Sequence, residues 1–441
     1  MRKAALSLQH LLAMFGSTVL VPLLTGFDPS VAIFCAGIGT LIFHFCTDWR
    51  VPVFLGSSFA FIGVINQVSD AFNGDLAYAQ GGIIVAGCLY IIMSLIVKFI
   101  GVEKVKKYFP PQVTGAMIAV IGLNLIPSAV DMAMTYLPIA IITLAVAMGI
   151  NQFAKGSIKQ FGVIIAIITL AIAIGINKFA KGSIRQFSVI IAVFTGLALS
   201  FILKQVDITT ASQASWFAIP NFRLPKFSLE AILMIAPVVL ATFMEHIGDI
   251  TTNGTVVGQN FIENPGLNRT LLGDGLATIF AGFAGGPANT TYGENTALLA
   301  ITKNYDPRVL ELTAVFAIVL SCVGKFGGFL QSIPQAVMGG ISIYLFSMIT
   351  YVGVKSIKDS KCYEGNIKNV IIMATVLIIG LGTSYLSTFA GIEIGIPLSQ
   401  TSSLTGLSLA AIVGVILNRV LNNSEFKDQE VEVETAIAES K

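Results

Sequence analysis

The sequence predicts an all-α integral membrane protein with about 14 transmembrane segments, arranged as two inverted sets of seven. Three observations predict this fold. Hydrophobic residues make up 55% and charged residues 11% of the 441-residue chain, whereas a soluble domain carries about 25% charged residues. Apolar runs, many of them long enough to cross about 30 Å of hydrocarbon, recur from residue 5 to residue 418. Short motifs of the first half also return in the same order in the second half.

Twelve apolar segments are predicted to be spans, and two further segments are short and interrupted. The twelve lie near residues 5–25, 30–46, 79–100, 110–130, 136–150, 188–204, 229–249, 270–284, 308–324, 334–352, 366–387 and 401–418. The two interrupted segments, about 52–66 and 287–303, are broken by Gly, Pro, Ser and Asn. Short, interrupted segments at corresponding places in two halves are typical of a transporter site, where half-helices meet inside the membrane through short extended stretches.

The internal repeat is read at fixed offsets. At an offset of 236, the matched pairs are Gln9–His10 with Glu245–His246, Asp28–Pro29 with Asn264–Pro265, Gly37 with Gly273, Gly39 with Gly275, and Ser58 with Glu294. At an offset of 224, they are Pro110 with Pro334 and Gly115 with Gly339. Shared membrane composition is the alternative explanation, but the number and order of the matches favour duplicated halves.

Basic residues predict the orientation. Lys and Arg cluster at residues 2–3, 98–107, 303–308 and 355–368, while the loops 25–30, 67–78 and 129–135 contain neither. Because cytoplasmic loops are enriched in Lys and Arg, seven spans per half place all four clusters, and both termini, in the cytoplasm. The acidic tail, 422–441, is predicted to be disordered.

A second, much closer repeat lies within the first half. Residues 141–166 return almost unchanged as residues 167–192. The copy adds an apolar segment at 162–176, whose 15 residues span only about 22 Å as a helix. We therefore expect that this segment does not cross the membrane fully, so that the second half keeps its inverted orientation.

Two carboxylates in membrane-buried segments point to the function. Glu245 ends the apolar run 236–245, and Glu294 lies in the interrupted segment 287–303. An ionisable side chain at membrane depth is costly and usually faces a substrate, ion or proton pathway. His246 and Asp249 follow Glu245 closely, and Asp249 lies one turn further along the same helical face. Asp249 is either a proton relay or a water-facing helix end.

The interrupted segments predict what such a site would bind. A half-helix is expected to begin near Phe59 and another near Glu294, each presenting free backbone N–H groups and its positive dipole end to a cavity. Backbone N–H groups donate to carbonyls and carboxylates accept from ring N–H groups, so a nucleobase such as uracil fits. Phe59, Tyr292 and Phe346 are candidates for an aromatic wall, although Phe59 and Phe346 are individually more typical of packing residues. Gln9 and His10 are favoured as interhelical hydrogen-bond partners, and His44 as a packing histidine.

Several stretches of the sequence resemble a known family of transporters. Five stretches resemble the bacterial uracil permeases of the nucleobase–cation symporter-2, or nucleobase–ascorbate transporter, family. They are residues 6–22 (LSLQHLLAMFGSTVLVP), 55–62, 244–249, 285–303 and 320–340. The resemblance implies a core domain of spans 1–4 (residues 1–109) and 8–11 (229–325). It implies a gate domain of spans 5–7 (110–228) and 12–14 (326–421).

The resemblance also implies the site residues. Its substrate contacts carry over to Glu245, Glu294, Gly293, Tyr292 and Phe59, and Ser58 and Phe346 join them as further candidates. Proton coupling is assigned to Glu294, Asp249 and His246. Supporting roles fall to Gln9, His10, Asn295 and Thr302.

The chain departs from the family pattern at three positions. Ala297 replaces a glycine of the signature that begins at Glu294, Asp249 stands where some relatives carry a second histidine, and Phe346 stands where some carry tyrosine. The missing histidine changes the proton relay that the family implies. The tandem copy at 141–192 is not part of the family pattern.

These observations predict proton-coupled uracil uptake by alternating access across the bacterial inner membrane. A xanthine or uric acid carrier and an anion carrier of the same fold are the alternatives; a carboxylate at 294 argues against the anion carrier. The expected partners are a nucleobase and the lipid bilayer, with a possible homodimer formed through the gate domain. The net charge of +2 implies no nucleic acid. The chain carries no HExxH motif, metal-ligand cluster or nucleophile constellation, so it is not expected to be an enzyme or to need a metal or a cofactor besides protons.

Overall fold

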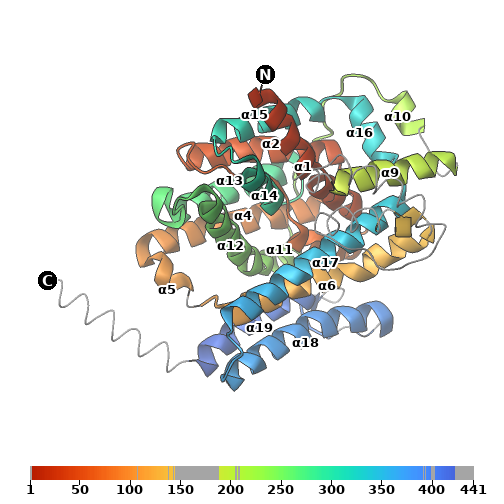
Figure 1. Ribbon diagram of the computed structural model, residues 1–441. Coiled ribbons are helices and arrows are strands. Elements are labelled where there is room, and N and C mark those ends of the chain that lie inside the picture. The colour runs from red at the N-terminus through yellow and green to blue at the C-terminus, as the bar shows by residue number, and fades with distance from the viewer. Residues whose placement is uncertain are drawn as a thin grey trace, which may run out of the picture.

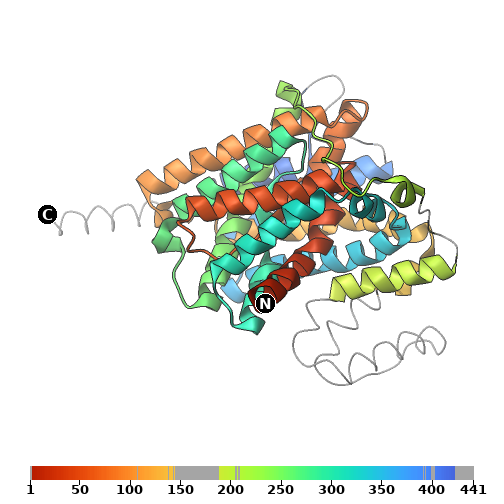
Figure 2. The same ribbon diagram turned by 90° about the horizontal axis from the view of Figure 1, so that it is seen from above.

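Long helices account for most of the protein, whose computed structural model describes residues 2–106, 108–137, 139–142, 144, 188–203, 206, 209–390, 392, 394–398 and 403–422 (Figures 1 and 2). The helices are α1 (Arg2–Thr25), α2 (Pro29–Cys46), η1 (Phe59–Phe61), α3 (Ile62–Ala71), α4 (Ala77–Ile100), α5 (Val102–Lys106), α6 (Pro111–Met134), α9 (Ser188–Ile202), α10 (Thr209–Gln213), α11 (Leu229–Ile235), η3 (Ala236–Val238), α12 (Val239–Val257), η4 (Ile262–Gly266), α13 (Leu267–Ala284), α14 (Gly293–Thr302), α15 (Pro307–Ser321), α16 (Gly324–Gln331), α17 (Gln335–Ser360), α18 (Ile367–Ala390) and α19 (Gly406–Leu421). The strands are β1 (Leu55–Ser57), β2 (Asn289–Thr291), β3 (Ile396–Pro397) and β4 (Ser403–Leu404).

The predicted all-α membrane fold is confirmed. Every predicted span overlaps one or more helices apart from 136–150; the predicted spans 136–150, 188–204 and 401–418 are described only in part. Among the described residues, seven helices are long and apolar enough to cross a membrane, or eight if α15 and α16, bent by 83° at their junction, form one broken span. The total of 14 spans stays a prediction. The predicted tandem segment 162–176 lies outside the described residues.

Several helices begin where the sequence supplies a cap. Asp28 and Asp306 are the N-caps of α2 and α15, and each side chain accepts a hydrogen bond from the backbone N–H two residues later. A proline follows each of these aspartates at the first helical position, where its missing N–H costs nothing. Pro110 and Pro334, the pair matched at an offset of 224, are the N-caps of α6 and α17.

Small residues bring the helices of one group into close contact. A Cβ on Gly37 of α2 would lie 2.7 Å from the carbonyl oxygen of Ala314 in α15, and one on Gly87 of α4 would lie 2.8 Å from the carbonyl oxygen of Gly275 in α13. Helices in lipid gain no hydrophobic stabilisation from associating, so such close van der Waals packing holds them together. The helices α1, α2, α4 and α12 to α15 form this group around the strands β1 and β2 (Figure 1).

A second group consists of α6, α17, α18 and α19, which lie together below the first group in Figure 1. The helices α6 and α17 are antiparallel, because Gly115 near the start of α6 meets Gly353 near the end of α17, whereas Ala133 near the end of α6 meets Gly339. Helices of the first group come from the segments predicted as core and those of the second from the segments predicted as gate, and the division into two domains stays a prediction. Their roles as core and gate remain predictions.

The predicted basic clusters gather at one end of the helices. Lys3 at the start of α1 pairs with Asp306 before α15 at 2.7 Å, and Arg269 at the start of α13 pairs with Asp48 after α2. In the other group, Gln112 at the start of α6 donates to Asn418 near the end of α19 at 3.2 Å. The basic residues 98–106, which end α4 and form α5, and 355–361, which end α17, belong to this same end. We call it the basic end.

Candidate functional site

The centre of the first group is a crossing of two short strands. β1 and β2 pair antiparallel, with Gly56 opposite Thr290. Beyond the ladder, the N–H of Ser58 donates to the carbonyl of Ala288 at 2.8 Å, and the N–H of Tyr292 donates to the carbonyl of Phe54 at 3.0 Å. η1 and α3 follow β1, and α14 follows β2. Irregular backbone at membrane depth is tolerated where protein buries it or a cavity meets it, and these residues are buried.

Both half-helices present open N-termini. Ser58 and Tyr292 are their N-caps, and neither side chain caps the helix. The hydroxyl of Ser58 is buried and has no hydrogen-bond partner in the described part of the chain. The first backbone N–H groups of each half-helix therefore remain available, at the positive end of the helix dipole, to an acceptor on a ligand.

The structure corrects the register of the internal repeat by two residues. The sequence matched Ser58 with Glu294, but the reciprocal bonds above make Ser58 equivalent to Tyr292. Ala60 is then the counterpart of Glu294. A fixed offset fails here because the segments that join the elements differ in length between the halves. The second crossing thus carries a carboxylate that the first one lacks.

Glu245 faces open space rather than a partner. It lies in α12, is half-buried and makes no hydrogen bond or ion pair with any described residue. Gly248, on the same helix, is exposed, and a Cβ added there would meet no atom within 4 Å. An unpaired carboxylate within a membrane-spanning helix is costly unless it faces a polar cavity. This face of α12 is therefore the strongest candidate for a ligand site.

Asp249 joins α12 to the second crossing. The hydroxyl of Thr291 in β2 donates to Asp249 Oδ2 at 2.7 Å. A Cβ on Gly293, the first residue of α14, would lie 4.0 Å from Asp249 Oδ1 and would meet nothing closer. Gly293 thus leaves room in front of the α14 N-terminus, between that terminus and the carboxylate face of α12.

Glu294 lies in the first turn of α14 and has a partner on α1. Ser17 donates its hydroxyl to Glu294 Oε1 at 2.6 Å. Sequence reasoning missed Ser17, which is one of several small polar residues in an apolar span and carries no distinguishing pattern. The bond leaves the second carboxylate oxygen of Glu294 for another donor.

His246 is placed differently from the prediction. Its ring is completely buried and contacts Asp274 at 3.0 Å and Thr270 at 2.9 Å, both in α13. Adjacent residues on a helix point about 100° apart, so His246 faces α13 while Glu245 faces the open side of α12. The structure does not bring His246 into contact with the carboxylates Glu245, Asp249 and Glu294. Asp274, also missed, was signalled only by its charge within an apolar run.

The predicted supporting residues mostly serve the helix contacts. The side-chain amide of Asn295 in α14 donates to the ring and to the backbone carbonyl of His10 in α1, both at 3.1 Å, as expected for an interhelical pair. Gln9 is half-buried beside it. The hydroxyl of Thr302 donates to the carbonyl of Leu298 within α14, at the far end of that helix from Glu294. His44 contacts the carbonyl of Val53 at 2.8 Å.

The three predicted aromatic residues do not form one wall. Tyr292 is buried behind the strands: its hydroxyl donates to the carbonyl of Ser57 at 2.9 Å, and a Cβ on Gly56 would lie 2.3 Å from its ring. Only the backbone of Tyr292 is therefore free to contact a ligand. Phe59 and Phe346 pack edge to face, with ring centroids 6.0 Å apart. Phe346 is fully buried and Phe59 half-buried, which leaves Phe59 as the ring that can reach a ligand.

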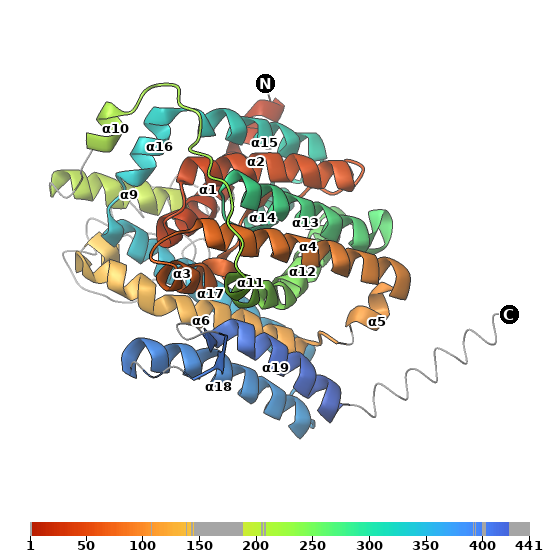
Figure 3. The same cartoon turned by 180° about the vertical axis from the view of Figure 1, so that it is seen from behind.

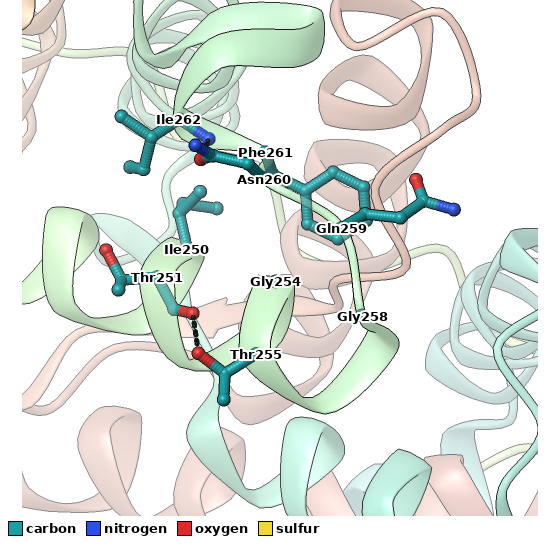
Figure 4. Close-up of a pocket in the computed structure, with 9 residues that line it drawn as sticks. All are labelled: Ile250, Thr251, Gly254, Thr255, Gly258, Gln259, Asn260, Phe261 and Ile262. Carbon is teal, nitrogen blue, oxygen red and sulfur yellow. Dashed lines mark hydrogen bonds between the residues drawn. The ribbon is translucent and has the colours of Figure 1, made fainter.

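A separate recess of about 390 Å³ lies at the end of α12 (Figure 4). Its lining residues are Ile250, Thr251, Gly254, Thr255, Gly258, Gln259, Asn260, Phe261 and Ile262. None of these side chains is ionisable, and neither Glu245 nor Asp249 lines it. The recess is therefore distinct from the carboxylate face of α12.

Known proteins match this chain over nearly its whole length. A family model described as the permease family matches residues 1–389. A probable uracil permease of Haemophilus influenzae is 37% identical over 430 residues, which cover 96% of this chain and 94% of the relative. The uracil permease of Bacillus subtilis is 40% identical over 434 residues, which cover 94% of this chain and 91% of the relative.

Solved structures share the fold at low sequence identity. The overall structure of SLC26A9 matches with a TM-score of 0.57 and 11% identity, covering 95% of this chain and 64% of that one. The transmembrane domain of the cyanobacterial bicarbonate transporter BicA matches with a TM-score of 0.52 and 15% identity, covering 94% of this chain and 96% of that one. These likenesses support the transporter fold alone. By its sequence match, the chain belongs to the permease family in which the uracil permeases are found.

Proposed function

We propose that this protein is a proton-coupled uracil carrier that works by alternating access. One observation carries the proposal most strongly: Glu245 is a half-buried, unpaired carboxylate in a membrane-spanning helix, one turn before Asp249, which lies in front of the open N-terminus of α14. The relatives that are named uracil permeases match 94–96% of the chain, which supports the choice of substrate.

The groups around this space complement a pyrimidine dione. Uracil alternates N–H donors with C=O acceptors around a planar ring. Glu245 offers acceptors for the ring N–H groups, and the backbone N–H groups at Gly293 and Glu294 offer donors for a carbonyl. Phe59 offers a ring face or edge. Hydrogen bonds to charged groups contribute about 1.5–3 kcal/mol each, so a carboxylate is the contact that matters most.

Glu294 is proposed to be the residue that couples proton movement to transport, and Asp249 is the second candidate. Ionised Glu294 accepts the hydroxyl of Ser17; protonated Glu294 presents a neutral acid that can donate to a substrate carbonyl. Binding of the substrate would then favour the protonated form. Movement of the first helix group against the second would carry proton and substrate together. His246 is not part of this relay, because its ring contacts α13 instead.

The basic end is proposed to face the cytoplasm of a bacterium, with both termini on that side. The enrichment of Lys and Arg there supports this orientation. The predicted contact between two copies through the α6, α17, α18 and α19 group remains a prediction.

Reconstituted transport tests the proposal. Purified protein in liposomes should accumulate radiolabelled uracil when the outside is made acidic, and a protonophore should abolish the accumulation. Xanthine, uric acid and bicarbonate are the comparison substrates. Stronger accumulation of xanthine or uric acid would assign the carrier to that substrate class, and bicarbonate movement without uracil movement would overturn the nucleobase assignment.

A further inference from the structure

The segment 214–228, which we call the strap, crosses the end of the helices opposite the basic end. It connects α10 to α11 without forming a helix or strand, and Figure 3 shows it passing over the ends of α2 and α4. Six of its side chains are large, apolar and exposed. They are Trp216 (78%), Phe217 (72%), Ile219 (73%), Phe222 (43%), Leu224 (83%) and Phe227 (56%). A water-facing loop has no reason to expose so much apolar surface.

The strap is fastened to the first helix group at both ends. The N–H of Ala218 donates to the carbonyl of Cys322 at 3.0 Å, and the carbonyl of Trp216 accepts from Gly324 at 3.2 Å. At the other end, the N–H of Lys226 donates to the carbonyl of Ala77 at 2.8 Å. The apolar side chains are therefore held outward by a fixed backbone.

The hydrogen-bonding needs of the strap backbone limit the depth at which the strap can lie in a membrane. A non-helical backbone leaves N–H and C=O groups that need water or headgroups, so the strap is excluded from the hydrocarbon core. Exposure of its apolar side chains to water, in contrast, costs free energy. Both demands are met at the boundary between headgroups and acyl chains, where Trp and other amphipathic residues gather. Arg223 is exposed on the same segment and suits a lipid phosphate, while Lys226 pairs with Asp75 at 2.7 Å.

We propose that the strap is an interfacial anchor that inserts Trp216, Phe217 and Leu224 into the lipid leaflet opposite the basic end. Because the strap is bonded to α4 and to the α15–α16 junction, it ties the first helix group to that leaflet. Any movement of this group along the membrane normal then drags apolar side chains through the interface.

The two tryptophans of the chain provide the test. Trp49 lies after α2 near the basic end and is 46% exposed, so Trp49→Phe leaves Trp216 as the single fluorophore and Trp216→Phe leaves Trp49 as its matched control. Both variants keep an aromatic ring, and neither residue lies in the proposed substrate site. Each is reconstituted in phosphatidylcholine bilayers that carry a bromine at a shallow or a deep acyl position, and aqueous iodide is used as the opposing quencher.

The proposal predicts blue-shifted Trp216 emission that shallow brominated lipid quenches more than iodide does, with the ring about 5–10 Å below the headgroup surface. Emission of fully hydrated tryptophan, quenched by iodide and by neither lipid, would overturn it. So would emission that shifts on dilution of the protein in the bilayer, because that result assigns the strap to a contact between two copies. Uracil uptake is measured separately, so a failed anchor and a failed carrier assignment are distinguishable.

Discussion

The two half-helix crossings share a frame but differ in chemistry. After each half-helix, an aspartate accepts a backbone N–H at the start of the next helix and also lies 2.7 Å from the ammonium group of a distant lysine: Asp75 from Lys226, and Asp306 from Lys3. At the centre, however, the second crossing carries Glu294 where the first has only an apolar alanine. Duplication thus accounts for the frame, while the charged groups are confined to one copy.

The helices that precede the crossings differ in the same way. α12, in the second half, carries Glu245 and Asp249 on its open face. α1, in the first half, contributes the hydroxyls of Ser17 and Thr18, which reach Glu294 and Tyr292 of the other half. One copy therefore supplies the carboxylates, and the other supplies the hydroxyl of Ser17, which donates to one of them, Glu294. This difference between the halves lets a symmetric frame bind an asymmetric ligand. Substitutions in either half can test it.

The largest effect is expected from Glu294→Gln. The substitution mimics the neutral acid permanently, so uracil should still bind while proton-driven accumulation is lost. Uptake into liposomes at several outside pH values measures this, and exchange of internal for external uracil shows whether binding and movement survive. Accumulation that keeps the parent's pH dependence would assign coupling to Asp249.

Glu245→Gln should weaken uracil binding by about tenfold or more, because it replaces a charged acceptor pair with one acceptor and one donor. Equilibrium binding to the purified variant measures the change. Glu311→Gln is the matched control, since Glu311 is a partly buried carboxylate of α15 that lies outside the proposed site. Binding within twofold of the parent would remove Glu245 from the site.

Gly56→Ala should damage the crossing itself. The new methyl group would lie 2.3 Å from the ring of Tyr292, and overpacking of this kind costs about 1–3 kcal/mol. Thermal unfolding in detergent should therefore begin at a lower temperature. Gly63→Ala in α3 is the control, because a Cβ there meets nothing within 4 Å. Equal melting temperatures of the two variants would show that the close contact with Tyr292 does not exclude a side chain at position 56.

The smallest effects are expected at the matched aspartates, which lie outside the spans. The lysine hydrogen bond lowers the pKa of Asp75 and, in the other half, of Asp306. Because each pKa is lower in the folded protein than in the unfolded chain, each ionised carboxylate stabilises the fold. That contribution is complete above the ordinary carboxyl pKa and is lost as the pH falls through the lowered value.

Asp75→Asn and Asp306→Asn should therefore each reduce the melting temperature slightly at pH 7 and have less effect at pH 3. Exposed ion pairs contribute little, so both shifts should be near the resolution of the measurement and similar to each other. A large shift from one variant alone would show that the two copies of the frame are not equally stabilised.

The sequence predicted the positions of the helices and half-helices better than the side-chain contacts between them. Apolar runs and Pro-containing caps located the helices, and the interrupted segments located both half-helices, because these features depend on local composition. The two-residue error at Ser58 arose because a fixed offset cannot register unequal connecting segments. His246 follows Glu245 directly in the sequence but faces α13, because neighbouring residues on a helix point about 100° apart.

Other contacts depend on tertiary pairing and left no local signal. Ser17 bonds to a residue 277 positions away, and nothing in an apolar span distinguishes a serine that bonds to its own helix from one that reaches across. Tyr292 was expected to face a ligand, but Gly56, by lacking a side chain, lets its ring fold behind the strands. The presence of an aromatic residue at a site predicts its chemistry but not its direction.

The pairing of β1 with β2 also constrains how the protein is made. Residues 55–57 leave the ribosome more than 230 residues before their partners at 289–291. Until those partners arrive, the backbone of β1 has no ladder to complete, and lipid offers it no substitute. The first half is thus inserted in an unfinished form whose central strand must stay hydrated or be held by another protein. The centre of the structure can therefore close only after residues 289–291 have been made.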